Sequence, residues 1–246
     1  MHVNAMKHLI SAIQFLTRLP VHGQAEFNPR AMIPFFPMAG LIIGLLTALV
    51  DLAAASLWPR STASIIDVIF IIAVTGALHL DGLGDSADGL YNHHDREKAL
   101  SIMKDSRIGT MGLTAIICAL AAKWGGIVHL DAHRTLLLVL VPAYARAGMM
   151  FGIRFLPYGR PEGTGREFFG NPPGIKAFGW FIVPLVLSGF LGWKALMLNA
   201  GFAVGTAGIL IYYKNRMGCI TGDMLGGMVE ISEAGLFLLL SAGGIG

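Results

Sequence analysis

The stretch TASIIDVIFIIAVTGALHLDGLGDSADG, residues 62–89, joins an apolar run directly to three aspartates. The run at 62–80 has nearly the roughly 20 residues that a helix needs to cross a bilayer. Asp81, Asp85 and Asp88 follow at spacings of four and three residues, which places them on one face of a helix. Because anions at a membrane boundary are costly unless they are neutralised, this face predicts a site for a hard cation such as Mg²⁺.

The composition extends this interpretation to the whole chain. Of 246 residues, 54% are hydrophobic and 13% are charged, whereas soluble domains have about 25% charged residues. Seven apolar stretches come near the length of a spanning helix, namely 33–57, 62–80, 110–130, 135–155, 177–193, 195–213 and 224–246. We therefore predict an all-α fold, a polytopic integral membrane helical bundle with about seven transmembrane helices.

The whole chain, 1–246, is expected to form a single membrane-embedded domain, because no linker or low-complexity segment divides it. Its N-terminal part, 1–32, has a short apolar run and then Arg18 and Pro20, without the cleavage site of a signal peptide. We expect this part to form an interfacial or re-entrant helix. Three glycine pairs have the spacing that lets membrane helices approach closely: Gly40 and Gly44, Gly148 and Gly152, and Gly201 and Gly205.

The loops indicate the orientation. If the stretches alternate across the membrane, the loops 81–109, 157–176 and 214–223 lie on the same side as the N-terminus. Thirteen of the 18 Lys and Arg residues flank that side, three flank the other, and two lie within apolar stretches. The positive-inside rule makes the richer side cytoplasmic. We therefore predict a multi-pass protein of the cytoplasmic (inner) membrane with its active site on the cytoplasmic side.

A second motif, IMKDSRIG at 102–109, combines Asp105 with Lys104, Ser106 and Arg107 just before the next apolar stretch. Arginine offers a planar fork to phosphate oxygens, and amides at a helix start bind anions, so the motif suits a phosphorylated ligand. The alternative is a basic loop that contacts lipid headgroups. The adjacent carboxylates argue against that alternative.

A third motif places Asp223, Glu230 and Glu233 at spacings of seven and three residues, again on one helical face. Two acidic faces on separate helices are what a metal-diphosphate site requires. Alternatively, Glu230 and Glu233 form buried ion pairs with Lys123 or Arg146, since charges within membranes are usually matched. The two interpretations are compatible. If Arg146 is not paired in this way, it is a candidate contact for a ligand phosphate.

Two further features flank these motifs. His79 directly precedes the aspartates and is positioned to hydrogen-bond one of them. The loop 157–176 is rich in glycine and contains Arg160 and Arg166. It is either a segment that closes over a ligand or a plain helix connector.

Five stretches of this chain resemble the cobalamin synthase family, also called the adenosylcobinamide-GDP ribazoletransferases. They are FLTRLP at 15–20, FPMAG at 36–40, HLDGLGDSADGL at 79–90, IMKDSRIG at 102–109, and TGDMLG at 221–226 with the two following glutamates. The long aspartate motif and the Lys-Asp-Ser-Arg motif are the specific ones. Gly84 and Gly227 stand where many members have alanine, which exchanges one small residue for another.

The resemblance implies a Mg²⁺-dependent enzyme that joins adenosylcobinamide-GDP to α-ribazole, or to α-ribazole 5′-phosphate, and releases GMP. The product is adenosylcobalamin or its 5′-phosphate, formed in the last steps of cobalamin nucleotide-loop assembly. This chemistry is phosphoryl transfer to an alcohol. The expected surroundings are membrane lipid and no nucleic acid. A homo-oligomer and association with other cobalamin-assembly enzymes both stay open.

The resemblance also suggests roles for the residues. Asp88 and Asp85, with Asp105, are the candidate catalytic carboxylates, and Asp88 ranks slightly ahead as proton acceptor. The candidate phosphate-binding residues are Lys104, Ser106, Arg107 and Arg146. The candidate metal ligands are Asp81, Asp85, Asp88, Asp223, Glu230 and Glu233.

Two other functions compete with this one. A CDP-alcohol phosphotransferase of the phospholipid type also holds a metal and a diphosphate with aspartates at helix ends, but its signature has an Ala-Arg pair that is missing after Asp81-Gly82. An ion-coupled secondary transporter would place its acids at the midplane between internal repeats. Here the acids gather at one surface.

Overall fold

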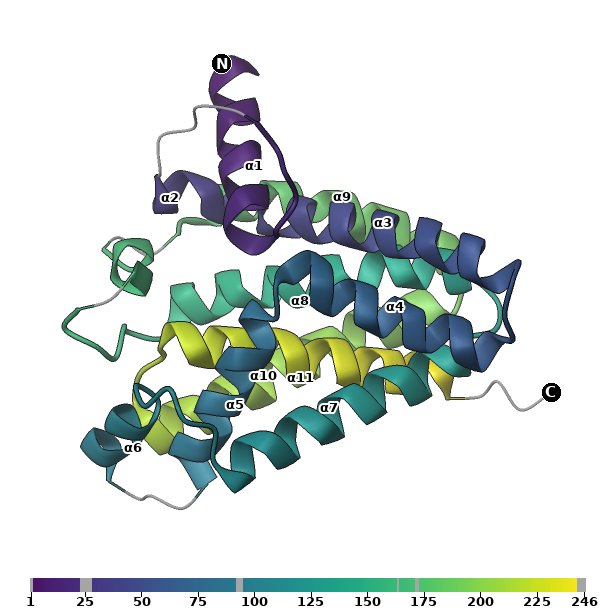
Figure 1. Ribbon diagram of the computed structural model, residues 1–246. Helices are drawn as coiled ribbons and strands as arrows, with labels where there is room; N and C mark the ends of the chain where they lie inside the picture. The colour runs from purple at the N-terminus through teal and green to yellow at the C-terminus, as the bar shows by residue number, and fades with distance from the viewer. Residues whose placement is uncertain (1, 23–27, 92–94, 163, 171–172, 243–246) are drawn as a thin grey trace.

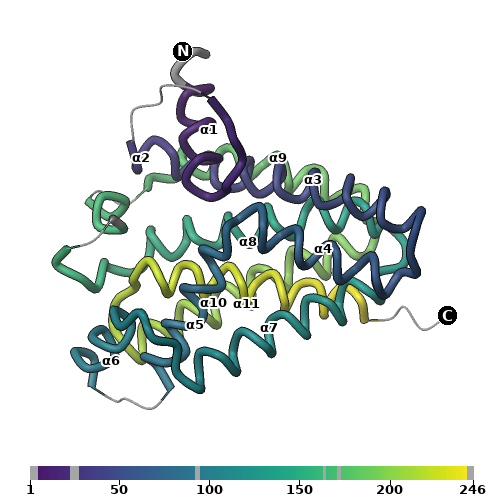
Figure 2. Tube along the Cα trace, viewed as in Figure 1, coloured from purple at the N-terminus to yellow at the C-terminus, as the bar shows by residue number. Residues whose placement is uncertain are grey.

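The structure, a computed structural model, describes residues 2–22, 28–91, 95–162, 164–170 and 173–242. Regular structure in these residues is helical, and extended pairing is limited to one bridge between Tyr158 and Ile220. The prediction of an all-α fold is confirmed. Figures 1 and 2 show long helices lying roughly alongside one another, with both ends of the bundle closed by loops.

Five segments in the described part of the chain are long and apolar enough to cross a membrane. The first runs through α2 (Pro29–Met32), the 3₁₀ turn η1 (Ile33–Phe35) and α3 (Phe36–Ala55). The others are α7 (Thr110–Val128), α8 (Arg134–Phe155), α10 (Lys194–Met217) and α11 (Gly222–Ser241). These five segments support a multi-pass membrane bundle.

The number of spans is smaller than the predicted seven. The stretch expected at 177–193 is a shorter apolar succession of 3₁₀ and α turns, η3 (Ile175–Phe181), α9 (Ile182–Ser188) and η4 (Gly189–Leu191). The stretch expected at 62–80 forms α4 (Arg60–Thr75), which bends by 90° into α5 (Leu78–Tyr91). The described residues therefore give five spans, or six if α4 and α5 count as one bent span.

The bend between α4 and α5 has a local cause. Gly76 ends α4 with a φ of 60°, and Ala77 follows with a φ of 58°, so two successive residues adopt the left-handed conformation. This conformation suits glycine and is unfavourable for alanine. The bend turns the polar helix α5 away from the axis of the apolar helix α4. We therefore place α5 at the membrane boundary, outside the spanning segments.

Close helix packing forms the body of the bundle. Helix α11 lies at its centre and contacts α5, α7, α8 and α10, as Figure 1 also shows. Helix α3 lies along α8, where a Cβ atom on Gly40 would come within 2.5 Å of the Ala143 backbone. Gly44 approaches the Val139 backbone in the same way, so the first predicted glycine pair does permit a close contact.

The other two glycine pairs differ in their contacts. Gly148 and Gly152 face Met228 and Leu225 of α11. Gly201 faces Leu239, whereas no atom of the described residues lies within 4 Å of the position of a Cβ atom on Gly205. The spacing therefore identifies two pairs in which both glycines lie at helix contacts, and a third pair in which only Gly201 does, among the described residues.

The N-terminal helix α1 (His2–Leu16) stands apart from the long helices and meets the bundle near the start of α3, as Figure 1 shows. Its 15 residues are fewer than a spanning helix needs. An interfacial or re-entrant position for 1–32 stays a prediction, as does the assignment of the whole chain to a single domain.

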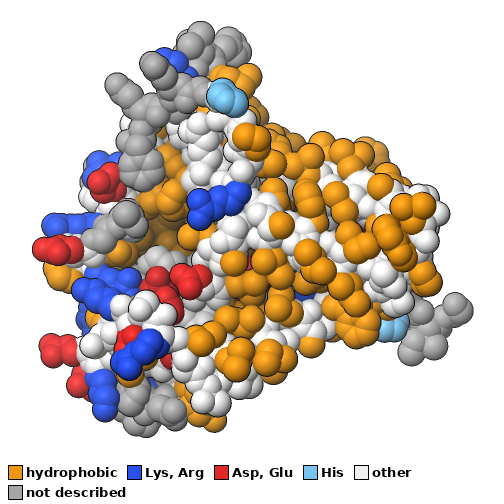
Figure 3. All heavy atoms as spheres, viewed as in Figure 1, with side chains coloured by type: hydrophobic (Ala, Val, Ile, Leu, Met, Phe, Trp, Pro, Cys, Tyr) orange, Lys and Arg blue, Asp and Glu red, His pale blue; other side chains and the backbone are white. Residues whose placement is uncertain are grey.

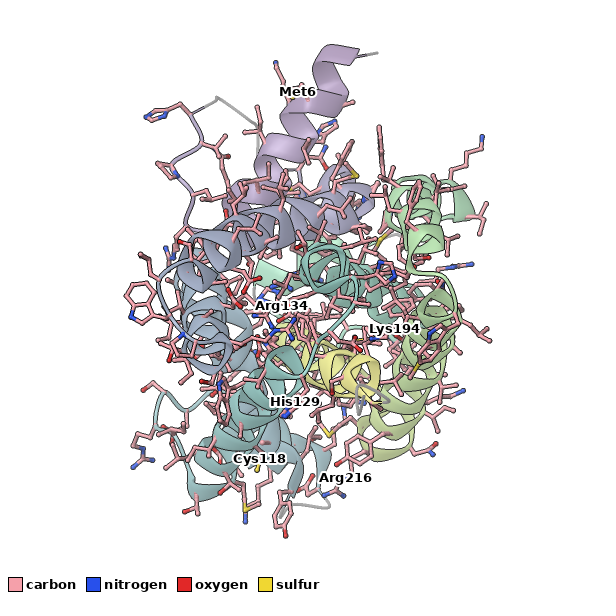
Figure 4. All side chains as sticks on the ribbon, turned by 90° about the vertical axis from the view of Figure 1, so that its right-hand side faces the viewer. Met6, Cys118, His129, Arg134, Lys194 and Arg216 are labelled. Carbon is pink, nitrogen blue, oxygen red and sulfur yellow. The ribbon has the colours of Figure 1, made fainter. Side chains whose placement is uncertain are left out.

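Charged side chains are arranged differently at the two ends of the bundle. Lys, Arg, Asp and Glu side chains crowd the left end of Figure 3, and hydrophobic side chains cover most of the body to its right. At the opposite end, Arg134 is buried and lies 2.6 Å from Asp51 and 3.0 Å from Asp67. Figure 4 looks onto this end and shows Arg134 among the helices. These ion pairs join α3, α4 and α8 far from the polar motifs.

Candidate active site

The three predicted aspartates lie on α5, immediately after the bend. Asp81, Asp85 and Asp88 are all within this helix, so the predicted single face is confirmed. Asp81 is exposed, and Asp85 and Asp88 are half-buried. The spacing of four and three residues thus directs three carboxylates toward one side of a helix at the membrane boundary.

Asp223 reaches the same place from α11. A Cβ atom on Gly82 would lie 2.7 Å from the Asp223 carbonyl oxygen, so only a glycine lets α5 approach the start of α11 this closely. The hydroxyl of Thr221 accepts a hydrogen bond of 3.2 Å from the Met224 amide and caps α11. Asp223 is therefore fixed in the first turn of α11, beside the aspartates of α5.

The electrostatics of Asp85 reflect this crowding. Its pKa is raised to about 6, first by burial and then by the negative charges of Asp81 and Asp223, with a smaller contribution from Asp88. The guanidinium of Arg160 acts in the opposite direction. A raised carboxyl pKa in a cluster of anions means that the charged form lacks compensation there. The site has the electrostatics of one that receives a cation.

Arg160 supplies the partner of Asp223. Its Nη2 atom donates to Asp223 Oδ2 at 2.5 Å and to the carbonyl of Met103 at 3.2 Å. The segment before it is held by the Gly159 amide, which donates to the Ile220 carbonyl at 2.9 Å. From the sequence, Arg160 is predicted only to lie in a loop that closes over a ligand or connects two helices, and the glycines around it are the available signal.

Asp88 is bound differently from its neighbours. Its Oδ2 accepts from the Gly109 amide at 2.7 Å, and its Oδ1 accepts from the Gly112 amide at 2.8 Å. Asp88 thus joins α5 to the N-terminus of α7, where a carboxylate also interacts favourably with the helix dipole. Both oxygens already accept hydrogen bonds, so we assign Asp88 a structural role. Its predicted catalytic and metal-binding roles stay predictions.

The motif at 102–109 lies in the loop between α6 (Arg96–Ile102) and α7. Arg107 holds Asp105 through several hydrogen bonds, the shortest 2.6 Å from Nη2 to Oδ2, and these bonds lower the pKa of Asp105 to about 2. A carboxylate with so low a pKa is a weak base. Lys104, Ser106 and Arg107 are exposed, and so remain accessible to a phosphorylated ligand.

Glu230 and Glu233 lie deeper in the bundle, and both are buried. Lys123 Nζ lies 2.6 Å from a carboxylate oxygen of each glutamate, and Arg146 Nη1 contacts Glu233. The predicted alternative of buried ion pairs is confirmed. Glu230 is seven residues beyond Asp223, or about 10 Å along a helix. We therefore leave both glutamates and Arg146 out of the proposed catalytic machinery.

The donor set fits a cation that is shared with a substrate. Among the described residues, no three His, Cys, Asp or Glu side chains converge closely enough to hold a metal by themselves. Mg²⁺, however, usually keeps several waters and takes one or two carboxylates together with substrate phosphates. Asp81 and Asp223, on two helices beside the poorly compensated Asp85, meet that requirement.

An apolar cavity of about 180 Å³ adjoins these carboxylates. Asp81 and Asp223 form part of its wall together with His79. The remaining lining comes mainly from aromatic and aliphatic side chains of α1, α3, α8 and α11. The site therefore combines an anionic rim with an apolar interior.

Comparisons with known proteins agree with this geometry. The profile described as cobalamin-5-phosphate synthase matches residues 8–241. A protein of Herpetosiphon aurantiacus named adenosylcobinamide-GDP ribazoletransferase is 36% identical over 242 residues, covering 96% of this chain and 97% of the relative. Proteins of the same name from Alkaliphilus metalliredigens and Acinetobacter baumannii are 32% and 34% identical, covering 97% and 90% of this chain and 97% and 92% of the relatives. No solved structure matches the chain.

Proposed function

The chain belongs to the cobalamin-5-phosphate synthase family, and we propose that its cluster of Asp81, Asp85 and Asp223 is the centre of the family's transfer reaction. The chain transfers the corrinoid phosphoryl group of adenosylcobinamide-GDP to α-ribazole or its 5′-phosphate. A ribose hydroxyl attacks the phosphorus atom on the corrinoid side of the diphosphate. The bond to the GMP oxygen breaks, the hydroxyl proton passes to a base, and GMP leaves.

One observation carries this assignment of the site. Asp81, Asp85 and Asp223 gather from two helices at the polar end, and the cation that contacts this cluster among the described residues is Arg160. Three carboxylates beside one guanidinium leave an excess of negative charge. A substrate diphosphate would add to it unless a divalent cation were also bound. We therefore propose that Mg²⁺ binds with the substrate, and that Asp81 and Asp223 hold it.

Bound Mg²⁺ would supply charge neutralisation for the diphosphate. Asp85, with its pKa of about 6, is the best placed proton acceptor for the ribose hydroxyl, since it is more basic than an ordinary aspartate and free of backbone donors such as those on Asp88. Arg160 orients Asp223 and bridges it to the loop at Met103. Lys104 and Arg107 are proposed to contact the departing GMP phosphate.

The position in the membrane belongs to the same proposal. Thirteen of the 18 Lys and Arg residues lie in the N-terminal segment, at the end of α8 or in the loops on the side of the polar end. By the positive-inside rule this end faces the cytoplasm, and the membrane is the inner one. Both substrates would then reach the site from the cytoplasm, along the membrane surface.

The two rival functions lose support. Relatives over 90% or more of the chain share the ribazoletransferase name, which favours a corrinoid substrate over a CDP-alcohol. The described acids at the polar end lie at the membrane boundary, whereas the deeper glutamates are matched by Lys123 and Arg146. A transporter would need unmatched acids near the midplane.

The test is GMP release by the purified protein in lipid nanodiscs from adenosylcobinamide-GDP and α-ribazole, at varied Mg²⁺. We expect activity to require Mg²⁺ and to fall at least 100-fold in Asp85→Asn. Asp95→Asn is the matched control, because Asp95 caps α6 at the same end and asparagine caps equally well. Near-normal turnover of Asp85→Asn would remove the cluster from the mechanism, and nucleotide release from CDP-diacylglycerol alone would favour the rival transferase.

A further inference from the structure

The apolar cavity beside the carboxylates is bounded by helices from both halves of the chain. Its lining includes Phe15 and Phe36, near the junction of α1 and α3, and Phe168 from η2 (Thr164–Phe168). Met149 and Ile153 of α8 also line it. Figure 3 shows a hollow with hydrophobic side chains near the left end of the molecule and acidic side chains below it. The cavity thus offers a largely apolar and aromatic surface.

Besides the two aspartates at the rim, the wall contains the polar side chain of His79. It is only 1% exposed, and neither Nδ1 nor Nε2 has a hydrogen-bond partner among the residues that the structure describes. A buried polar group without a partner is destabilising, so a ligand that supplies the partner gains from it. The predicted hydrogen bond from His79 to an aspartate is not seen among the described residues. An imidazole carries at least one N–H, so His79 offers a donor to whatever occupies the cavity.

The cavity is also placed to receive one end of a reacting molecule. Asp81 and Asp223 line it as well as belonging to the carboxylate cluster. A ligand whose apolar end fills the cavity therefore has its polar end at the carboxylates. Its volume of about 180 Å³ exceeds that of an apolar cavity of about 150 Å³ that accepts benzene. The size suits a small aromatic ring system.

We propose that this cavity binds the aromatic base of α-ribazole and that His79 donates a hydrogen bond to the free ring nitrogen of that base. The inference rests on the proposed function and specifies which substrate lies where. The base is a benzimidazole, a fused ring system with two methyl groups and one free acceptor nitrogen, so it matches an apolar cavity with one unpartnered donor.

The other parts of the substrates fit less well. Guanine has several donors and acceptors that need partners, and the cavity offers few polar groups to satisfy them. The corrin ring is far larger than the cavity. With the base in the cavity, its attached ribose extends toward Asp81 and Asp223, and the attacking hydroxyl reaches the carboxylate cluster.

The test pairs a change in the protein with a change in the substrate. In GMP-release assays, the wild-type protein is compared with His79→Leu and His79→Gln, each with α-ribazole and with the matching indole riboside, which lacks the acceptor nitrogen. We expect the wild-type protein to have about a tenfold higher KM for the indole riboside. His79→Leu should raise the KM for α-ribazole about tenfold and lose this discrimination, with an unchanged KM for adenosylcobinamide-GDP.

His79→Gln keeps a donor and should retain part of the discrimination. Ser86→Ala is the matched control, since Ser86 is also a buried residue of α5 with an unpartnered hydroxyl, but does not line this cavity. If His79→Leu does not fold, the wild-type preference for α-ribazole over the indole riboside still tests the acceptor.

The outcomes separate the two proposals. Failure of the wild-type protein to release GMP from the natural substrates would count against the proposed function. GMP release by the wild-type protein without discrimination between the two ribosides would overturn the assignment of the cavity. A His79→Leu effect on the KM for adenosylcobinamide-GDP instead of α-ribazole would overturn it too.

Discussion

Arg160 Nη2 lies 2.5 Å from Asp223 Oδ2, although 63 positions separate the two residues in the chain. This ion pair ties the glycine-rich segment after α8 to the first turn of α11. It also sets a guanidinium next to the carboxylate cluster, where it lowers the pKa of Asp85 against the effect of the neighbouring anions. The contact therefore links the position of a loop to the charge of the site.

The first prediction concerns this arginine. Arg160→Ala should lower kcat/KM for GMP release at least tenfold, because it leaves Asp223 without its cationic partner and releases the loop at Met103. It should also move the acidic limb of the pH–rate profile to higher pH, since Arg160 lowers the pKa of Asp85. Arg166→Ala, in the same loop and with a side chain that donates only to the Pro161 carbonyl among the described residues, is the control and should retain activity. A profile that does not move would contradict the electrostatic link.

The second prediction is a pH dependence set by Asp85. With a pKa raised to about 6, its carboxylate takes up a proton as pH falls through that value, so activity should rise between pH 5 and pH 7. Because Mg²⁺ held by Asp81 and Asp223 would favour the charged form of the neighbouring Asp85, more Mg²⁺ should shift the limb to lower pH. The rate of GMP release at several Mg²⁺ concentrations measures both effects.

The raised pKa of Asp85 affects stability in the opposite sense to activity, because the free energy of unfolding should fall as pH rises. A carboxyl group with a raised pKa in the folded protein binds its proton more tightly there than in the unfolded chain. Its contribution to the free energy of unfolding is therefore favourable at low pH and is lost as pH rises from about 4 to about 6. Asp85→Asn should remove this contribution. An equally pH-dependent thermal midpoint in that variant would contradict the assignment.

The third prediction separates the buried ion pairs from the chemistry. Arg146→Met should destabilise the protein by about 3 kcal/mol or more, because it leaves Glu233 buried beside Lys123 alone. Arg146→Met combined with Glu233→Leu should recover part of that loss. Thermal unfolding in detergent, followed by circular dichroism, measures both. If the single variant kept its stability but lost activity, Arg146 would return to the list of phosphate-binding candidates.

The fourth prediction concerns Asp88. Asp88→Ala should lower the unfolding free energy by about 1–2 kcal/mol, the usual effect of losing a helix cap, because the amides of Gly109 and Gly112 lose their acceptor. Asp88→Asn keeps one acceptor oxygen and should be milder. Chemical denaturation combined with GMP release distinguishes the roles, since a catalytic Asp88 would abolish turnover in the asparagine variant without a loss of stability.

Much of the fold follows from local patterns in the sequence. The apolar runs predict the long helices, and five of the seven expected stretches do form spanning segments. The bend after α4 was not predicted, because it depends on left-handed φ angles at Gly76 and Ala77 that composition does not reveal. The stretch at 177–193 is as apolar as a span, yet it forms a succession of short 3₁₀ and α helices.

The site shows the same division. The spacing of Asp81, Asp85 and Asp88 predicts their common face. The sequence also predicts ion pairs for Glu230 and Glu233 as an alternative, but leaves open whether Lys123 or Arg146 is the partner. Nothing in the spacing showed that Asp88 would bind backbone amides or that Arg160 would meet Asp223. Each of those contacts joins residues from separate elements.

Apolar length and helical period are local properties, so the order of amino acids is enough to predict the membrane class, the family, the helices and the end of the bundle at which the polar motifs gather. Which carboxylates remain available at the site depends instead on the packing of the helices. Helical period fixes which side chains share a face, but the partner opposite that face depends on how neighbouring helices rotate and pack. In this packing Asp88 binds amides of α7 and Glu233 pairs with Arg146, whereas Asp81 and Asp223 line an apolar cavity.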